Sequence, residues 1–190
     1  MFYLIIIIIL ENMKKDSIAL IGFMATGKSV VGKALVKQLG NEFKFVETDD
    51  LVIKLAGKSI PEIFSKDGEA VFRQFEIEAC KKVSNLDKVV ISCGGGIVLN
   101  NVNIEILKRG CYIVLLTASV EEIYNRILTD GYNTRPLINT NNPLEEIKRI
   151  LTYRQPFYDS AADIVINTTG KSVKKVVNLI LDKMIELDSY

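Results

Sequence analysis

The stretch that decides the fold of this 190-residue chain is Gly22-Phe-Met-Ala-Thr-Gly-Lys-Ser29. It has the form G-x4-G-K-S and lies between an apolar segment, residues 18–21, and an amphipathic one, residues 30–39. Glycines permit a tight loop whose N–H groups face inward, and a helix behind the loop adds the positive end of its dipole. This order of strand, loop and helix predicts a phosphate-binding loop, and therefore a chain that binds a nucleoside triphosphate.

The motif also predicts roles for individual residues. Lys28 should reach the β- and γ-phosphates of ATP, and the Ser29 hydroxyl should ligate Mg²⁺. The predicted nucleotide-binding residues of the loop are Gly22, Ala25, Thr26, Gly27, Lys28, Ser29 and Val30.

Outside the loop, short apolar runs alternate with longer amphipathic ones, a pattern typical of βα units around a parallel sheet. Near-continuous apolar character indicates strands that are buried on both faces. We therefore expect an α/β protein with a three-layer P-loop kinase fold, in which helices flank a five-stranded parallel sheet. The predicted strands are 18–21, 43–46, 89–92, 112–116 and 164–166.

Helix signals lie between these runs, and Ser59–Glu62 and Ser119–Glu122 both have the capping-box form. One segment stands apart, residues 129–143 (TDGYNTRPLINTNNP), which is rich in Asn, Thr, Gly and Pro and is predicted to form a mobile lid. The predicted helices are 30–39, 69 to about 86, and 172–187.

The composition excludes several classes of protein. The chain has no His, which rules out Ser-His or Cys-His catalysis and imidazole metal sites. Its 24 basic and 23 acidic residues give a net charge of +1, so the composition lacks the excess of positive charge that binding to nucleic acid or an anionic membrane would require. Three widely spaced cysteines, Cys80, Cys93 and Cys111, indicate reduced, buried thiols in a cytoplasmic protein.

The N-terminus begins with an apolar run, FYLIIIIIL, at residues 2–10. A membrane-spanning helix needs about 20 such residues, and a signal peptide would need flanking features that are missing here. We interpret residues 1–12 as an upstream extension and residues 13–190 as one domain, with no stable membrane association. A membrane tether remains the alternative.

The residues after the loop narrow the class of nucleotide-binding protein. Many nucleotide-hydrolysing proteins hold Mg²⁺ with an Asp at the end of a hydrophobic strand, but strand 89–92 runs into Gly94-Gly95-Gly96 instead. The acidic residues follow the second strand, as Glu47-Thr-Asp-Asp50. No Asn/Thr-Lys-x-Asp motif supports specificity for guanine.

From about residue 17 to the C-terminal helix, the chain resembles the shikimate kinases. The similarity rests on six pieces at compatible spacing: GFMATGKS (22–29), ETDD (47–50), SIPEIFSKDGEAVFRQFE (59–76), SCGGG (92–96), TRPL (134–137) and the Arg154/Tyr158 pair of YRQPFY. The resemblance implies phosphorylation of the 3-hydroxyl of shikimate by ATP with Mg²⁺, giving 3-phosphoshikimate and ADP for aromatic amino-acid biosynthesis. It also implies a monomeric cytoplasmic enzyme that acts on a small molecule and not on nucleic acid.

For the acceptor substrate, the resemblance implies that Asp49 meets the shikimate hydroxyls and accepts the proton of the attacking one. Arg73 and Arg154 match two arginines that bind the shikimate carboxylate, for which planar guanidinium groups are well suited. Gly94, Gly95 and Gly96 would bring bare backbone against substrate and γ-phosphate.

For the nucleotide, the resemblance implies that Arg135 is a lid arginine that stabilises the transferring phosphoryl group. Arg126 matches an arginine that stacks on adenine. Glu47 stands where the family usually has Asp, a residue that supports Mg²⁺ through water.

Two alternatives remain open at this point. The first is another P-loop metabolite kinase, such as a gluconate or nucleotide kinase. The second is a non-catalytic, ATP-binding regulatory domain, although the joint presence of Lys28, Asp49, Arg73, Arg135 and Arg154 argues against it. An ADP-release assay with shikimate, gluconate and nucleoside monophosphates would separate all three readings.

A chain shortened to begin at Met13 should fold and phosphorylate its substrate as the full-length chain does, because the predicted domain begins beyond residue 12. The measurement is the activity and unfolding temperature of both forms, together with their partitioning into lipid vesicles. Loss of folding on truncation, or vesicle binding by the full-length chain alone, would contradict the interpretation.

Overall fold

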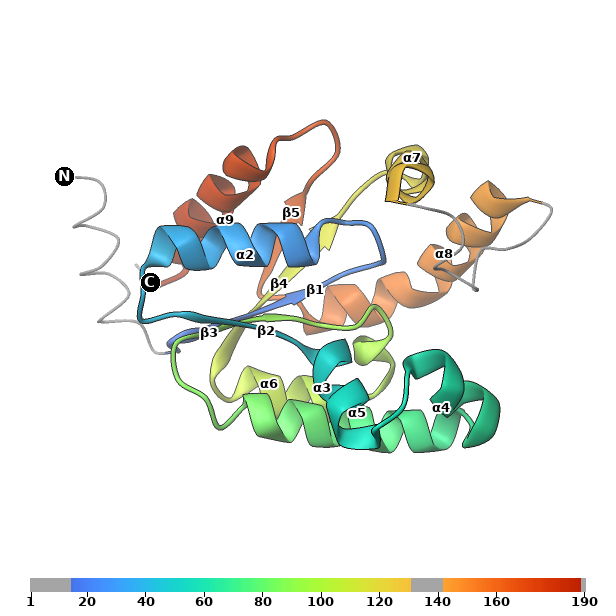
Figure 1. The fold of residues 1–190 in the computed structure, drawn as a ribbon. Coiled ribbons are helices and arrows are strands. Elements are labelled where there is room, and N and C mark those ends of the chain that lie inside the picture. The colour runs from blue at the N-terminus through green and yellow to red at the C-terminus, as the bar shows by residue number, and fades with distance from the viewer. Residues whose placement is uncertain (1–14, 131–141, 189–190) are drawn as a thin grey trace.

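The computed structural model describes residues 15–130 and 142–188, which form a three-layer α/β domain (Figure 1). Its five parallel strands have the order β2-β3-β1-β4-β5, so β1 lies at the centre, and the prediction of a five-stranded parallel sheet is confirmed. The strands are β1 (Ser17–Ile21), β2 (Lys44–Glu47), β3 (Val89–Ser92), β4 (Cys111–Thr117) and β5 (Ile164–Asn167).

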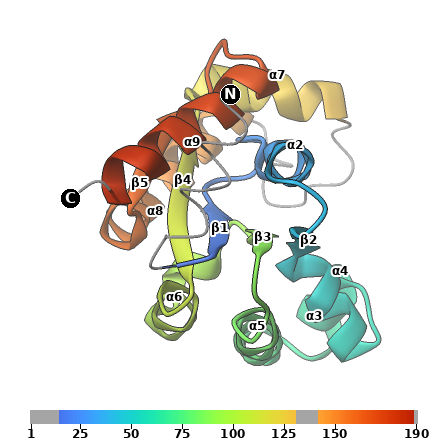
Figure 2. The same ribbon diagram turned by 90° about the vertical axis from the view of Figure 1, so that its left-hand side faces the viewer.

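Helices cover both faces of the sheet (Figure 2). Helices α2 (Lys28–Leu39) and α9 (Val173–Asp188) pack on one face, whereas α5 (Glu69–Val83), α6 (Asn101–Lys108) and the end of α8 (Pro143–Ala161) pack on the other. The remaining elements are α3 (Thr48–Ala56), α4 (Ile60–Lys66), the 3-10 helix η1 (Ile97–Leu99) and α7 (Val120–Asp130).

Successive side chains of β1 point to opposite faces of the sheet, which explains why its sequence is a continuous apolar run. Ile18 and Leu20 belong to the core beneath α2 and α9, whereas Ala19 and Ile21 belong to the core beneath α5 and α6. Both faces of the strand are therefore buried. The strand also begins one residue earlier than predicted, because Ser17 pairs with Cys111 in the register of β1 and β4. Its buried hydroxyl accepts a hydrogen bond from the N–H of Val89 at 3.2 Å.

The predicted helix ends are partly confirmed. At Ser59 the capping box is complete, with the Ser59 hydroxyl and the Glu62 carboxylate each accepting from the other residue's N–H. At Ser119 the prediction of a full box is wrong. The N–H of Glu122 does donate to the Ser119 hydroxyl, but the N–H of Ser119 donates to Thr169, and the Glu122 carboxylate pairs with Arg126.

Two further expectations concern the ends of α5 and the lid. Helix α5 ends at Val83, three residues before the predicted end, where the chain turns. The predicted lid, residues 129–143, overlaps the end of α7 and the first residue of α8, and its residues 131–141 lie outside the described residues.

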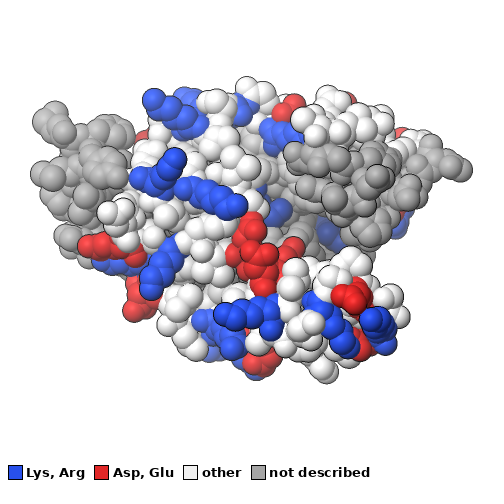
Figure 3. Space-filling view, in the orientation of Figure 1, with Lys and Arg blue, Asp and Glu red and all other residues white. Residues whose placement is uncertain are grey.

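The three cysteines are free and buried in the core between the sheet and α5 and α6, as predicted. None of the helices within residues 15–130 and 142–188 is both long and apolar enough to cross a membrane. The apolar run at residues 2–10 lies outside the described residues. On the face seen in Figure 3, acidic and basic side chains are interspersed.

Replacing Gly22 by Ala should destabilise the fold, because the phosphate-binding loop leaves no room for a side chain there. Gly22 has φ of +136°, and a Cβ atom would lie 2.2 Å from the backbone oxygen of Leu116. Backbone strain and overpacking of this kind cost about 1–3 kcal/mol each. Thermal unfolding measures the effect, with Gly110→Ala as the control because nothing lies within 4 Å of its Cβ position. Equal unfolding temperatures for the two variants would contradict the prediction.

Candidate active site

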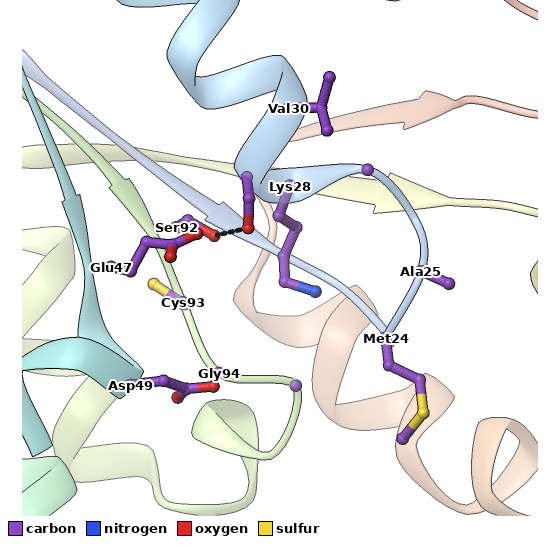
Figure 4. A pocket seen from close by; sticks show the side chains of 12 residues that line it. Met24, Ala25, Lys28, Val30, Glu47, Asp49, Ser92, Cys93 and Gly94 are labelled. Atoms are coloured by element: carbon purple, nitrogen blue, oxygen red, sulfur yellow. Dashed lines mark hydrogen bonds between the residues drawn. The ribbon is translucent and has the colours of Figure 1, made fainter. Parts of the chain in front are cut away.

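A cavity of about 340 Å³ opens at the carboxyl ends of β1, β2 and β3, next to the start of α2. Parallel α/β sheets bind ligands at this edge, where the loops after the strands converge. Figure 4 shows the side chains of Lys28, Glu47 and Asp49 directed toward the same space. The chemistry-bearing residues of its lining are Lys28, Ser29, Glu47, Asp49, Ser92 and Gly94.

The phosphate-binding loop joins β1 to α2 in the predicted way. Gly22 and Gly27 both have positive φ, and Ala25 adopts the left-handed conformation with φ of 57°. Inside the loop, the buried Thr26 hydroxyl donates to the carbonyl of Phe23 at 2.8 Å. These conformations curl the backbone around the N-terminus of α2, so that its N–H groups and dipole favour an anion.

The Lys28 ammonium group lies against its own loop. Its Nζ donates to the carbonyl oxygens of Gly22 at 2.9 Å and Phe23 at 2.8 Å. A flexible four-carbon side chain can exchange such neutral acceptors for phosphate oxygens, which form stronger, charge-assisted hydrogen bonds.

Oxygen donors gather beside the loop from three elements. The Ser29 and Ser92 hydroxyl oxygens are 3.4 Å apart, and Glu47 is paired with Ser92 in the register of β2 and β3. Hydroxyl and carboxylate oxygens suit Mg²⁺, which is usually bound by one or two side chains together with phosphates and water. The described residues contain no cluster of three His, Cys, Asp or Glu that could enclose a metal by itself.

Asp49, in the first turn of α3, faces the cavity from the side opposite the loop. Its carboxylate lies against the backbone of Gly94, where a Cβ atom would come within 2.5 Å of Oδ1. The side chain opens onto the cavity, and the surrounding protein, which removes part of its hydration, raises its pKa. The Lys28 ammonium opposes this rise, whereas Glu47 and Asp50 add to it. The result is a more basic carboxylate than an ordinary Asp.

The glycine loop, Gly94–Gly96, is held at each of its residues. The N–H of Gly94 donates to the buried hydroxyl of Thr48 at 2.9 Å. The carbonyl of Gly95 accepts from the Tyr158 hydroxyl at 2.6 Å and from the Arg154 guanidinium at 3.1 Å. Burial raises the pKa of Tyr158 to about 12, so its hydroxyl stays protonated and continues to donate at neutral pH.

Arg73, on α5, lies against the last residue of this loop. A Cβ atom at Gly96 would be 3.0 Å from the Arg73 guanidinium, which also contacts the Gly96 carbonyl at 3.4 Å. Two carboxylates of the same helix fix the guanidinium, Glu69 and Glu76, each at 2.9 Å. Glu76 is only 2% exposed, so this ion pair is screened from solvent on one side.

Arg154, on α8, approaches the glycine loop from the other side. Its guanidinium carbon lies 5.9 Å from the centre of the Phe23 ring, and one terminal nitrogen is bound to Gly95. Its Nε is buried and has no hydrogen-bond partner among the described residues. An unsatisfied buried donor of this kind lowers the stability of the free protein.

A second cavity, of about 450 Å³, lies on the other side of the phosphate-binding loop and shares Ala25, Gly27 and Val30 with the first. Arg126 lines it and donates to the carbonyls of Ala25 at 3.1 Å and Thr168 at 3.0 Å. The two cavities therefore flank one anion-binding loop, as the phosphate and base portions of a nucleotide would require.

The structure brings together most of the predicted site residues. Lys28, Ser29, Glu47, Asp49, Gly94 and Gly95 line the first cavity, and Arg73, Gly96 and Arg154 adjoin it through the glycine loop. Arg126 lies at the second cavity, and Arg135 lies outside the described residues.

Several residues of the site were not identified from the sequence. Glu76 follows Arg73 by three positions on a helix, a spacing that could have indicated the pair. Thr48 and Asn103 carry no such signal, because each contacts a segment distant in the sequence.

Comparison with known proteins agrees with this geometry. A family model described as shikimate kinase matches residues 24–185. The shikimate kinase of Thermodesulfovibrio yellowstonii is 42% identical over 165 residues, covering 87% of this chain and 92% of the relative. The shikimate kinase of Caldanaerobacter subterraneus is 41% identical over 171 residues, covering 90% of this chain and 97% of the relative.

Solved structures give the same result. Shikimate kinase from Acinetobacter baumannii in complex with shikimate superposes with a TM-score of 0.83 at 30% identity, covering 91% of this chain and 94% of the other. The shikimate kinase of Aquifex aeolicus superposes with a TM-score of 0.74 at 36% identity, covering 91% of this chain and 98% of the other. A gluconokinase from Sinorhizobium meliloti shares the fold alone, with a TM-score of 0.55 at 17% identity. With the predicted motifs assembled around one phosphate-binding loop, this chain belongs to the shikimate kinase family.

Proposed function

We propose that the cavity at the carboxyl ends of β1, β2 and β3 is where this family member transfers the γ-phosphoryl group of ATP to the 3-hydroxyl of shikimate. The products are 3-phosphoshikimate and ADP, in the pathway to the aromatic amino acids. The observation that carries the proposal is the placement of Asp49, a carboxylate with a raised pKa, across one cavity from Lys28 and the phosphate-binding loop.

On the donor side, the loop amides and the start of α2 would hold the ATP phosphates, and Lys28 would exchange its carbonyl partners for phosphate oxygens. Arg126 would lie beside the base in the second cavity. Ser29 would ligate Mg²⁺ directly and Glu47 through water. When bound, the ion neutralises charge on the phosphates.

On the acceptor side, Asp49 would orient the attacking hydroxyl and accept its proton. Arg73 and Arg154 would bind the shikimate carboxylate, and the position of both guanidinium groups against the glycine loop supports this role. The bare backbone of Gly94–Gly96 would let the substrate approach between the two arginines.

Catalysis would then be mainly positioning and charge stabilisation, with in-line attack by the hydroxyl. By its match to the family motif, Arg135 would add positive charge to the transferring phosphoryl group. We further propose that the chain works as a cytoplasmic monomer with no nucleic-acid partner, with the enzyme domain beginning at Met13.

The variant Asp49→Asn is nearly isosteric and should lower kcat by about 10²–10⁴-fold, with little change in the binding of ATP or shikimate. Native activity requires the ionised carboxylate, so kcat should fall as pH drops through the raised pKa, and this acid limb should vanish in the variant. The measurement is a kcat–pH profile, with the neighbouring Asp50→Asn as control, which should retain the acid limb at a slightly lower pH because Asp50 adds to the raised pKa of Asp49. A native kcat in Asp49→Asn would remove Asp49 from the mechanism.

The variant Arg73→Lys keeps the charge but loses the planar, forked donor group, so shikimate binding should weaken about 10–100-fold while ATP binding stays unchanged. Titrations with each substrate measure this. Arg149→Lys is the matched control, since Arg149 pairs with Glu146 on the exposed surface of α8. Loss of ATP binding with intact shikimate binding would show that Arg73 serves the nucleotide, and the assignment of the carboxylate site would fail.

A further inference from the structure

We propose that Asn103 is a positioning residue for the acceptor substrate, which acts by fixing both the partner of Arg73 and the end of the glycine loop. The inference rests on the proposed role of Arg73 in binding the shikimate carboxylate. Asn103 lies in the first turn of α6, and its side chain is fully buried. It has no direct place in the cavity lined by Lys28 and Asp49.

The Asn103 amide nitrogen makes two directed contacts. Nδ2 donates to Oε2 of Glu76 at 3.2 Å and to the carbonyl oxygen of Ile97 at 3.3 Å. The same Glu76 oxygen accepts from the Arg73 guanidinium at 2.9 Å. One amide group of α6 is therefore connected to the substrate-binding arginine of α5 through a single shared oxygen atom.

The second contact reaches the glycine loop. Ile97 directly follows Gly96, and the N–H of Ile97 donates to the carbonyl of Gly94 at 3.1 Å, which closes the turn. By holding the Ile97 carbonyl, Asn103 fixes the loop end against which the Arg73 guanidinium lies. The arginine and the backbone beside it are thus aligned by one side chain.

The chemistry of this position requires a donor. Both neighbours of the amide, the Glu76 carboxylate and the Ile97 carbonyl, are acceptors, so the opposite amide orientation would set acceptor against acceptor. Oδ1 is buried and has no partner among the described residues. An unpaired buried acceptor lowers stability, and an apolar residue of the same size would avoid that penalty. Packing alone therefore does not account for an Asn here, whereas the orientation of Glu76 does.

The test is the variant Asn103→Leu, which keeps the volume and removes the donor. The KM for shikimate should rise about tenfold, while the KM for ATP and the unfolding temperature stay close to native values. Asn103→Ala, which removes the same donor without adding a charge, provides a second variant with the same expected direction. Asn101→Leu, at an exposed position of the same helix, is the control and should leave both KM values unchanged.

A double-mutant cycle with Arg73→Ala separates positioning from a general structural role. If Asn103 acts through Arg73, Asn103→Leu should raise the shikimate KM by less than twofold in the Arg73→Ala background. A full tenfold effect in that background, a native shikimate KM in Asn103→Leu, or failure of both Asn103 variants to fold would overturn the inference. If Arg73→Ala itself leaves the shikimate KM unchanged, the proposed function of Arg73 is wrong, and the positioning role that rests on it is overturned as well.

Discussion

The absence of side chains at Gly94–Gly96 is the constraint on which the rest of the site depends. Because no Cβ atom intervenes, the Asp49 carboxylate and the Arg73 guanidinium both lie directly against the backbone of this loop. The polar groups of the loop are bound by helices from separate parts of the chain, including Thr48 on α3 and Tyr158 on α8. The base and the carboxylate-binding groups of the proposed mechanism are thus positioned against the same loop, and a shift of the loop would displace both.

The two arginines beside the loop, Arg73 and Arg154, differ in their hydrogen-bond partners. Arg73 is bound by Glu69 and Glu76, and burial raises the pKa of Glu76 while the Arg73 charge opposes that rise. Its guanidinium is therefore oriented before any substrate arrives. Arg154 instead has no carboxylate partner among the described residues; one terminal nitrogen donates to the Gly95 carbonyl, and its Nε is buried without a partner. Under the proposed function, two guanidinium groups on opposite sides of the glycine loop would bind the carboxylate between them.

The sequence predicts those parts of the structure that depend on neighbouring residues. The phosphate-binding loop, the five strands and the cap at Ser59 follow from local patterns, and the structure confirms them. Helix α8 was not predicted, and it contains Pro156, a residue that usually ends or kinks a helix. The capping box predicted at Ser119 does not form, because the hydroxyl of Thr169, a residue distant in the sequence, accepts the hydrogen bond of the Ser119 N–H. The contact between Asn103 and Glu76 likewise joins two helices, and no local pattern specifies it.

The position of Lys28 links the two halves of the proposed reaction. Its ammonium group lowers the pKa of Asp49, against the larger effect of burial, and it does so while bound to the carbonyls of its own loop. Phosphate oxygens would draw this charge into charge-assisted hydrogen bonds and so weaken its effect on the carboxylate. Under the proposed function, Lys28 therefore belongs to the phosphate site and also sets part of the charge around Asp49.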